Sequence, residues 1–489
     1  MKRPSPAFAC LLALAVAVLV ASSARAGWPP PPGADMRDQA NWANDYKARW
    51  NYASFLPTQA PGTGPYTSAD KTLGASGMSI DRAWTHTIGR DDVKICVIDS
   101  GIHWEQADLL NKAALNAAEL KGEKRPKKAD GSACGGAGAL DGYDCNGDGV
   151  FNVADYKDDP RFTGTVAGEK CFKDGERTEL SANDRLKGDK NRNCVIDAGD
   201  LIEMFSDGVD DDANGYTDDI SGWDFFKNDN DPYDDTRYGH GTGEAKDSAA
   251  EGNNGIDDIG VCPNCRFIPL RVGDSFIADS NDFAKATVYA TDIGCKVVQE
   301  ALGTINQTAF SKAAIDYAYK KGVTVVASMA DENSRHTNFP AVANHTMTVH
   351  TVRYNGSNPT TSTSFLAFDT CSNYGAHLQL SISGTSCSSE ATGRASGIAG
   401  LVYSMGRQAG LTPELTAEEV IQIFRMNADD VDVLESRDAN KDVSGTFYWS
   451  QPGFDQRFGY GRANAFKMME SIKGGLIPPE VDLVSPEWF

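Results

Sequence analysis

The stretch Lys296-Val297-Val298-Gln299-Glu300-Ala301-Leu302-Gly303 reads as a β-strand that lies between two helical stretches, residues 281–293 and 308–321. Two β-branched runs, Arg266–Val272 and Val323–Ala327, flank these helical stretches on the outside and also read as strands. Strands that alternate with helices are typical of a parallel sheet with helices on both of its faces. The sequence therefore predicts a doubly wound α/β fold.

The same pattern extends in both directions along the chain. Upstream, we expect a buried strand at 93–98 that places Asp99 at its carboxyl end, where α/β sheets bind their ligands. Downstream, we expect helices at about 386–405, 417–427 and 463–473.

Length and charge narrow the class of protein. The chain has 489 residues, of which 40% are hydrophobic, so it is long enough for one large domain or two ordinary ones. Its formal net charge of -22 argues against binding to nucleic acid or to an anionic membrane surface. Such a charge fits either a solvated surface or carboxylates that are gathered around cations.

The first residues are typical of a cleaved secretory signal. A basic start, Met1-Lys2-Arg3, precedes an apolar run from Phe8 to Ala21 and a small-residue end, Ala24-Arg25-Ala26. No later segment has the roughly 18 uninterrupted apolar residues that a spanning helix needs. We therefore predict a signal peptide at 1–26 and a secreted, monomeric protein without a membrane partner, with the periplasm as an alternative location.

The cysteine count suits an exported protein. Of the 11 cysteines, all except Cys10 follow the predicted signal, and an even number after export favours disulfides. The easiest local pairings are Cys134 with Cys145, Cys171 with Cys194, and Cys262 with Cys265, although spacing does not fix connectivity. Cys96 and Cys295 lie in apolar strand-like runs, and we expect them to be free and buried.

Residues 131–235 form an acidic insert with little periodicity. Within it, a twelve-residue loop that begins at Asp144 carries oxygen-bearing side chains at its positions 1, 3, 5, 9 and 12 and Gly149 at position 6. This is the spacing of dockerin and EF-hand calcium loops, although the last position holds Asp155 where EF-hands have Glu. The first candidate ligand set is Asp144, Asn146, Asp148, Asn152 and Asp155.

Two further acidic runs in the insert resemble this loop more weakly. The second has Cys194 where a glycine is expected, and the third surrounds an Asn-Gly turn. A solvated acidic loop is the alternative for all three, but hard oxygens at this density favour structural Ca²⁺, on which folding of the insert would depend. The candidate ligands are Asp189, Asn191, Asn193, Asp197 and Asp200 in the second run, and Asp210, Asp212, Asn214 and Asp218 in the third.

Three polar residues stand beside glycines at the edges of predicted elements: Asp99, His240 and Ser386. Acyl transfer needs a nucleophile, a base that takes its proton and a carboxylate that orients the base, and these are the required residue types. The order Asp, His, Ser along the chain occurs in known triads. Taken alone, the stretch Ser383–Ser389 is more typical of a polar loop, because Ser, Gly and Thr clusters usually form loops.

The motifs around these residues resemble the three signatures of the subtilisin-like serine proteases, the subtilases. They are Val97-Ile98-Asp99-Ser100-Gly101, Gly239-His240-Gly241-Thr242-Gly243 and Ser383-Gly384-Thr385-Ser386. Residues 44–51 are similar to the start of the mature domain in the kexin-like branch. The resemblance implies a leader at 27–43, a peptidase domain at 44–474 that contains the insert, and a tail at 475–489.

The family resemblance also implies a fold and residue roles. The fold would be a three-layer α/β/α arrangement with a mainly parallel sheet, interrupted by the acidic calcium-loop insert. Ser386 would attack the peptide carbonyl, His240 would act as base and then acid, and Asp99 would orient His240. Ala301, Leu302 and Gly303 would line the substrate groove as an edge strand that pairs with an extended peptide.

Two residues depart from the family pattern. Asp331 stands where most subtilases have the asparagine that donates to the oxyanion, although some convertase-type members are similar to this chain in having Asp there. Losing one such donor costs on the order of 10²–10³ in rate, and a protonated Asp331 could still donate. Glu390 takes the place of the proline that follows the serine by four residues, and the space before residue 44 is too short for the usual inhibitory propeptide.

These observations favour a secreted, calcium-stabilised serine endopeptidase that acts on polypeptides. Asp331 and Glu390 together motivate an alternative, a catalytically weak or inactive binding or scaffold protein on the same fold. A third interpretation is a structural calcium-binding module in which the match to the triad is accidental.

Overall fold

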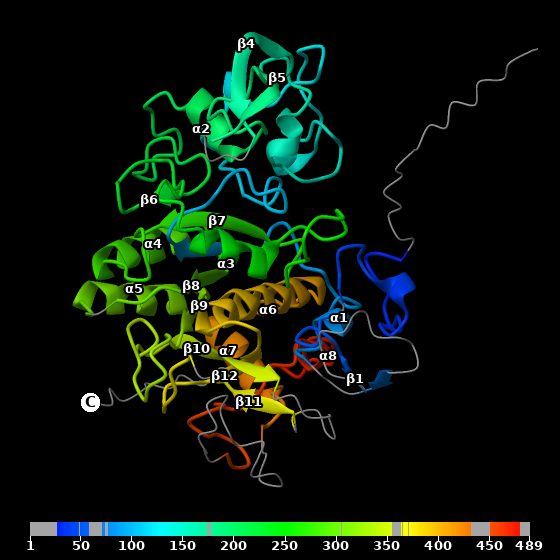
Figure 1. Ribbon diagram of the computed structural model, residues 1–489, viewed down its shortest axis with the longest axis vertical. Helices are drawn as coiled ribbons and strands as arrows, with labels where there is room; N and C mark the ends of the chain where they lie inside the picture. The colour runs from blue at the N-terminus through cyan, green and yellow to red at the C-terminus, as the bar shows by residue number, and fades with distance from the viewer. Residues whose placement is uncertain are drawn as a thin grey trace, which may run out of the picture.

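The structure is a computed structural model (Figure 1). It describes residues 27–47, 49–57, 71–73, 77–173, 178–304, 306–354, 363, 365–369, 371–431 and 450–479. The predicted signal peptide at 1–26 and residues 480–489 of the predicted tail lie outside the described residues.

The centre of the molecule is an eight-stranded sheet. Its strands lie in the order β11, β10, β9, β8, β3, β7 and β6, and β12 also pairs with β10. All neighbouring pairs are parallel except β10 with β11. The strand bounds are β3 Lys94–Asp99, β6 Trp223–Asp224, β7 Arg266–Arg271, β8 Val297–Glu300, β9 Thr324–Ser328, β10 Thr346–Tyr354, β11 Leu366–Phe368 and β12 Leu380–Ser383.

Helices cover both faces of this sheet, as Figure 1 shows. Alternate residues of β3 point to opposite faces: Ile95 and Val97 pack into the core under α3 and α6, whereas Cys96 and Ile98 pack into the core under α4 and α5. The predicted three-layer α/β/α fold is therefore confirmed. The helix bounds are α1 Ile80–Ala83, α3 His240–Ala249, α4 Ser280–Asp292, α5 Ala309–Lys320, α6 Ser388–Gln408, α7 Ala417–Met426 and α8 Ala465–Lys473.

Most predicted elements agree with the structure to within about two residues, but the strand at 296–303 is shorter than predicted. β8 ends at Glu300, and residues 301–303 leave the sheet at the carboxyl edge. A short antiparallel pair, β1 (Phe55–Pro57) and β2 (Lys71–Leu73), lies outside the main sheet.

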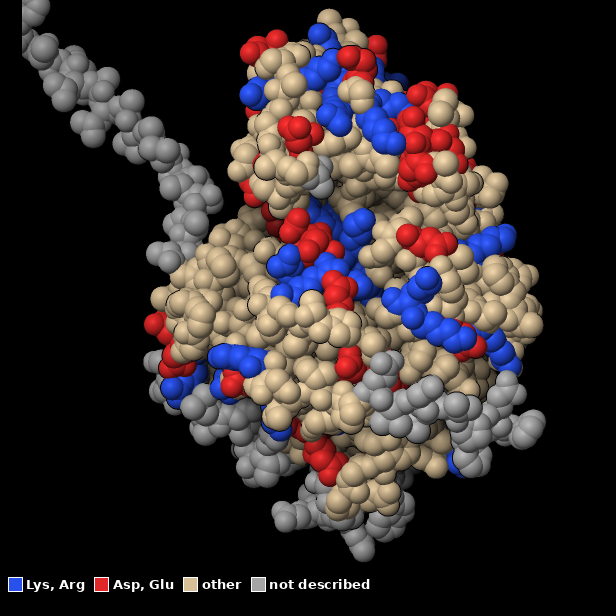
Figure 2. All heavy atoms as spheres, turned by 180° about the vertical axis from the view of Figure 1, so that it is seen from behind, with Lys and Arg blue, Asp and Glu red and all other residues tan. Residues whose placement is uncertain are grey.

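The acidic insert forms a lobe above the β6–β7 edge of the sheet (Figure 1). It contains an antiparallel pair, β4 (Thr165–Phe172) with β5 (Leu180–Leu186), and the helix α2 (Ala198–Phe205). Seen from behind, the lobe is set off from the body by a hollow, and basic side chains gather below it (Figure 2). Its buried aromatic residues Tyr156, Phe162 and Phe205 belong to the core cluster that also includes α3 and α6.

Five disulfides link the ten cysteines that follow the predicted signal. The three predicted local pairs are present, and the remaining bonds are Cys96–Cys295 and Cys371–Cys387. The prediction that Cys96 and Cys295 are free is wrong. Cys96 lies in β3 and Cys295 lies two residues before the adjacent parallel strand β8, which brings them to a Cα–Cα distance of 6.0 Å despite a sequence separation of 199. Both are buried, as predicted.

Among the described residues, the longest helix is too polar to cross a bilayer, and no helix meets the length and apolarity that a membrane span needs.

Candidate active site

Asp99 and His240 meet at the carboxyl edge of the sheet. Asp99 is the last residue of β3, and its side chain is almost fully buried. His240 is the first residue of α3, and its Nδ1 lies 2.8 Å and 3.0 Å from the two carboxylate oxygens of Asp99. The carboxylate therefore holds the imidazole in the tautomer that carries a proton on Nδ1.

Two glycines allow this approach. Gly239 precedes α3 with φ of 78°, in the left-handed region that a side chain disfavours. At Gly241, a Cβ would lie 2.4 Å from the carbonyl oxygen of Gly101 and 3.0 Å from the Cβ of Asp99. The start of α3 therefore packs directly on the end of β3, which is the local reason that glycine flanks His240 in the sequence.

The environment of His240 changes its pKa. Burial opposes protonation of the ring, but the charge of Asp99 and its hydrogen bond outweigh this and raise the pKa of His240 above its ordinary value. A base whose conjugate acid is stabilised in this way is suited to take a proton from a hydroxyl group.

Ser389 is the hydroxyl that faces His240. Its Oγ lies 3.0 Å from Nε2 of His240 and 3.4 Å from the carbonyl oxygen of Ala301. Ser389 is the second residue of α6 and is half-buried. At this position its own N–H belongs to the first helical turn, whose N–H groups have no intrahelical acceptor.

The structure therefore places Ser389, and not the predicted Ser386, against His240. Ser386 is exposed and precedes α6, and its N–H donates to Oε2 of Glu390 at 2.6 Å. Cys387 is the N-cap of α6, so the helix begins later than the Ser-Gly-Thr-Ser motif suggested. Counting four residues from Ser389 places Gly393, not Glu390, at the position where the family has proline.

Asp331 contacts Ser388, the first residue of α6. Its Oδ1 accepts hydrogen bonds from the N–H of Ser388 at 2.9 Å and from the Ser388 hydroxyl at 2.5 Å. Although the residue is exposed, the protein atoms around its carboxyl group raise its pKa, while the bonds from Ser388 and the charge of His240 act in the opposite direction. Asp331 therefore contacts the residue that directly precedes Ser389 in α6.

Glu390 organises the segment before α6. Its Oε2 accepts from the N–H groups of Thr385 and Ser386, both at 2.6 Å, and its Oε1 accepts from the Thr385 hydroxyl at 3.1 Å. It also forms an ion pair with Arg394, which is 2% exposed. Glu390 thus supplies the acceptors that order the backbone directly before α6.

Aromatic side chains that the sequence reasoning missed surround His240. The Phe276 ring lies 5.3 Å from the imidazole at 83°, and Tyr238 stacks at 5.8 Å. Both are exposed, at 59% and 37%. No sequence motif marks Phe276, because it lies in an irregular segment after β7.

The predicted substrate strand is already paired at its end. The N–H of Gly303 donates to the carbonyl oxygen of Phe276 at 3.1 Å, and the carbonyl oxygen of Gly303 accepts from the N–H of Ala278 at 3.0 Å. The prediction of a free edge along Ala301, Leu302 and Gly303 therefore needs correction at Gly303.

Comparison with known proteins agrees with this geometry. The profile of the subtilase family matches residues 90–461, about three quarters of the chain. The chain belongs to the subtilase family. Its general activity is that of a subtilisin-like serine endopeptidase, which acts on polypeptides.

Three named relatives of this subtilase come from Thermoactinomyces and Bacillus species. Thermitase of Thermoactinomyces vulgaris is 32% identical over 198 residues, which cover 39% of this chain and 69% of thermitase. A thermophilic serine proteinase of Bacillus sp. strain AK1 is 36% identical over 148 residues, covering 29% of this chain and 36% of that protein. A cell wall-associated protease of Bacillus subtilis is 28% identical over 295 residues, covering 55% and 31%. The chain thus spans about a third of the length of the second and third of these relatives.

Solved structures with a related fold include a lanthipeptide protease and sphericase. The first has 16% sequence identity and a TM-score of 0.45, over 80% of this chain and 91% of the other. Sphericase has 22% identity and a TM-score of 0.40, over 49% and 83%.

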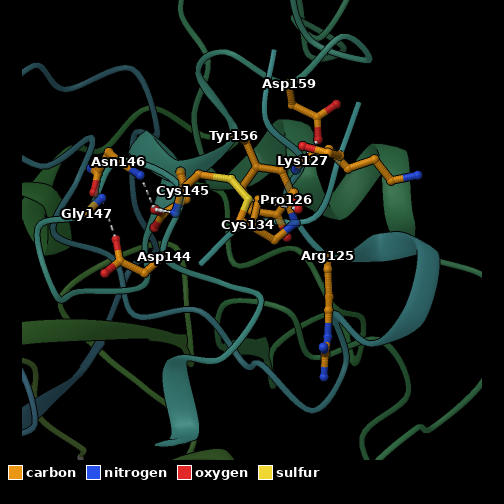
Figure 3. Close-up of a disulfide and its surroundings, with 12 residues drawn as sticks. Arg125, Pro126, Lys127, Cys134, Asp144, Cys145, Asn146, Gly147, Tyr156 and Asp159 are labelled. Atoms are coloured by element: carbon orange, nitrogen blue, oxygen red, sulfur yellow. Dashed lines mark hydrogen bonds between the residues drawn. A yellow bond between two sulfur atoms is a disulfide. The ribbon is translucent and has the colours of Figure 1, made fainter. Parts of the chain in front are cut away.

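In the first candidate calcium loop of this subtilase, acidic side chains accept hydrogen bonds from the backbone of the same loop. In the first, Asp144 accepts from the N–H groups of Gly147 at 2.7 Å and Gly149 at 3.1 Å, and the Cys134–Cys145 disulfide anchors the start of the loop (Figure 3). Asp155 caps the loop by accepting from the N–H of Cys145 at 2.8 Å. The acidic groups of this loop therefore point toward its centre.

The second loop holds a carboxylate oxygen without a partner. Oδ1 of Asp189 is buried and has no hydrogen-bond partner in the part of the chain that the structure describes. Burial also raises the pKa of Asp197 to about 7 and that of Asp200 to about 9. Cys194, at the expected glycine position, has a left-handed φ of 76°. A bound cation would compensate this buried negative charge.

The third run contributes to a cluster that includes a residue from outside the insert. Ligand atoms of Glu119, Asp212 and Asp219 lie within 4.8 Å of one another. Asp218, the predicted ligand, instead accepts from the N–H groups of Asp207 and Gly208, so its neighbour Asp219 takes its place. Burial raises the pKa of Glu119 to about 7, and its Oε2 has no partner among the described residues.

A further group of buried oxygens lies near the predicted start of the domain. Oδ1 of Asp45, Oδ2 of Asp108 and Oδ1 of Asn44 are buried without partners among the described residues. Asp45 and Asp108 are linked through Asn254, whose N–H and side-chain amide donate to them at 3.0 Å and 2.9 Å. Hard oxygens of this kind fit Ca²⁺, and no sequence motif marked them because they come from distant segments.

Proposed function

We propose that this subtilase is a secreted, calcium-stabilised endopeptidase in which Ser389 is the nucleophile, His240 the general base and Asp99 the residue that orients it. The observation that carries the proposal is the continuous contact from Ser389 Oγ through the imidazole of His240 to the Asp99 carboxylate, with distances of 3.0 Å and 2.8 Å. Nucleophile, base and orienting acid in hydrogen-bond contact are what acyl transfer requires.

The reaction follows from these positions. His240 Nε2 accepts the hydroxyl proton as Ser389 Oγ attacks the peptide carbonyl, and Asp99 stabilises the imidazolium that forms. The imidazolium then gives its proton to the leaving amine, which leaves an acyl-enzyme on Ser389. A water molecule that is activated by the same imidazole hydrolyses this ester.

The tetrahedral oxyanion has two candidate donors. One is the N–H of Ser389, at the positive end of the α6 dipole. The other is Asp331, which can donate only when it is protonated and which repels the oxyanion when it is ionised. The raised pKa of Asp331 supports a contribution from its protonated form, so we expect the highest activity at acidic to neutral pH.

We further propose that structural Ca²⁺ binds at Glu119, Asp212 and Asp219. The unpartnered, buried Oε2 of Glu119 supports a cation at this point, because an isolated buried carboxylate is costly. The loops at 144–155 and 189–200 are the other proposed sites. Calcium would supply charge compensation and join the insert to the segment that precedes it, and it takes no part in the chemistry of Ser389.

The alternative function is a weak or inactive subtilase that binds peptides without cutting them. One observation supports it: Oδ1 of Asp331 accepts two hydrogen bonds from Ser388, and an ionised carboxylate next to the start of α6 would repel an oxyanion formed at Ser389.

Labelling with a fluorophosphonate probe separates the two functions. We expect native protein and Ser386→Ala to be labelled and Ser389→Ala to remain unlabelled. Labelling that survives in Ser389→Ala but disappears in Ser386→Ala would restore the original serine assignment. A native protein that reacts no faster than Ser389→Ala would support the binding protein instead.

A further inference from the structure

The turn that carries Asp331 is strained. Ala330 has a φ of 70° and Asn333 a φ of 47°, both in the left-handed region that residues other than glycine enter at a cost. Such a turn keeps its shape only where its surroundings impose it.

The loop at 371–374 imposes that shape. The N–H of Asn333 donates to the carbonyl oxygen of Cys371 at 3.0 Å, and the N–H of Asn373 donates to the carbonyl oxygen of Ala330 at 2.7 Å. The buried side chain of Asn373 accepts from the N–H groups of Glu332 at 3.1 Å and Ser334 at 3.0 Å. Both ends of the turn are therefore held by the same loop.

A covalent bond joins this loop to the start of α6. Cys371 forms a disulfide with Cys387, the N-cap residue of the helix, with a Cα–Cα distance of 5.6 Å. Cys387 offers no side-chain cap, and its carbonyl oxygen accepts from the Thr351 hydroxyl at 2.6 Å. The reacting hydroxyl of Ser389 follows Cys387 by two residues.

The disulfide thus closes a ring of contacts around the site. From Cys387 the ring runs through Cys371 to the turn at 330–334, then through Asp331 to Ser388, which is again next to Cys387. Without the disulfide, the turn and the helix entry are still joined by the hydrogen bonds between Asp331 and Ser388. The Ser328 hydroxyl adds a second path, since it lies 2.6 Å from the Ser388 hydroxyl and accepts from the N–H of Ala330 at 3.1 Å.

We propose that the Cys371–Cys387 disulfide is a positioning element of the reaction, which fixes Asp331 and the first turn of α6 relative to each other. This inference rests on the proposed function of Ser389. Misplacement of a reacting group by about 1 Å can lower a rate by about 10²-fold, so we expect loss of the disulfide to lower kcat by about 10–100-fold and to change KM little.

The test compares two disulfide removals in the full chain. The variant Cys371→Ser/Cys387→Ser opens the half-buried bond at the site, and Cys262→Ser/Cys265→Ser opens a fully buried bond that lies before β7. Both variants lose one cross-link, but only the first is expected to have a lower kcat. Equal kcat values in the native protein and the first variant would overturn the inference, as would equal losses in the two variants.

A second measurement separates positioning from general stability. If the disulfide acts through Asp331, its removal lowers kcat less in an Asp331→Ala background than in the native background. The reason is that the alanine variant has no carboxyl group for the disulfide to position. Additive losses in this double-mutant cycle would mean that the disulfide does not act through Asp331.

A reduction experiment covers the case in which the serine variant does not fold. Native protein is treated with a phosphine reductant and an alkylating agent, and peptide mass spectrometry gives the fraction of open Cys371–Cys387 bonds. We expect the rate to fall with that fraction while circular dichroism is unchanged. Full activity with the bond open, or loss of activity only together with unfolding, would refute the inference. Failure of the proposed function is distinguishable, since it would show as an absence of Ser389-dependent hydrolysis in untreated protein.

Discussion

The two sides of the candidate active site are held in different ways. Asp99 ends a strand in the middle of the sheet, and His240 begins a helix directly after a left-handed glycine, so sheet pairing and close packing fix both. Ser389 and Asp331 instead lie on a helix entry and a strained turn that a disulfide and a buried Asn373 join. The first side follows from topology, whereas the second depends on individual side-chain contacts.

The largest expected effect tests which serine on the second side is the nucleophile. We expect Ser389→Ala to lower kcat for peptide hydrolysis by about 10⁶-fold, because base and nucleophile act as a unit. The exposed Ser386 makes no contact with His240 in the described structure, so Ser386→Ala should stay within about twofold of the native rate. Initial rates on an unstructured protein substrate measure both, and a larger loss in Ser386→Ala would reverse the assignment.

A smaller effect is expected at Asp331. An asparagine there donates to the oxyanion at every pH, so we expect Asp331→Asn to raise kcat at neutral pH by about 10²-fold. Native hydrolysis needs protonated Asp331 and neutral His240 together, so its rate should rise with pH through the lower of the two pKa values and fall through the upper one.

The shape of the pH profile provides the decisive comparison. In Asp331→Asn only His240 titrates, so the rate should rise through the raised pKa of His240 and remain level at alkaline pH. Profiles of kcat/KM from about pH 4 to 10 measure this difference. Identical shapes in native and variant protein would show that ionised Asp331 is tolerated beside the oxyanion.

The smallest expected effect concerns the proposed calcium sites, whose residues belong to neither side of the candidate active site. Occupancy at 100 times Kd stabilises a protein by about 2.7 kcal/mol, so chelation with EGTA should lower the melting temperature by several degrees. We expect Glu119→Gln to reduce this shift, whereas Asp130→Asn, a change at an exposed acid directly before the insert, should retain it. An equal shift in native protein and Glu119→Gln would argue against the cluster.

The sequence predicted the fold well because strand and helix periodicity carries that information locally. It also selected Asp99 and His240, whose positions at element edges follow from the same periodicity. It favoured Ser386 through the family motif, whereas Ser389 faces His240. The serines at 386, 388 and 389 lie within four residues, and only the start of α6 decides which of them faces His240. Glu119 was missed for a similar reason, since its partners come from a segment about 90 residues away in the chain.

The pairing of Gly303 with Phe276 and Ala278 has a consequence for what the enzyme cuts. A peptide that pairs with Gly303, as the family resemblance implies, would compete with the protein's own chain for the same two main-chain bonds, each worth about 0.5–1.5 kcal/mol net. A segment that is long, extended and free of its own structure can replace both bonds, whereas a short peptide or a segment within a folded domain cannot. We therefore expect the enzyme to discriminate by the conformation of its target, so that unfolded proteins are degraded while their folded counterparts survive beside them.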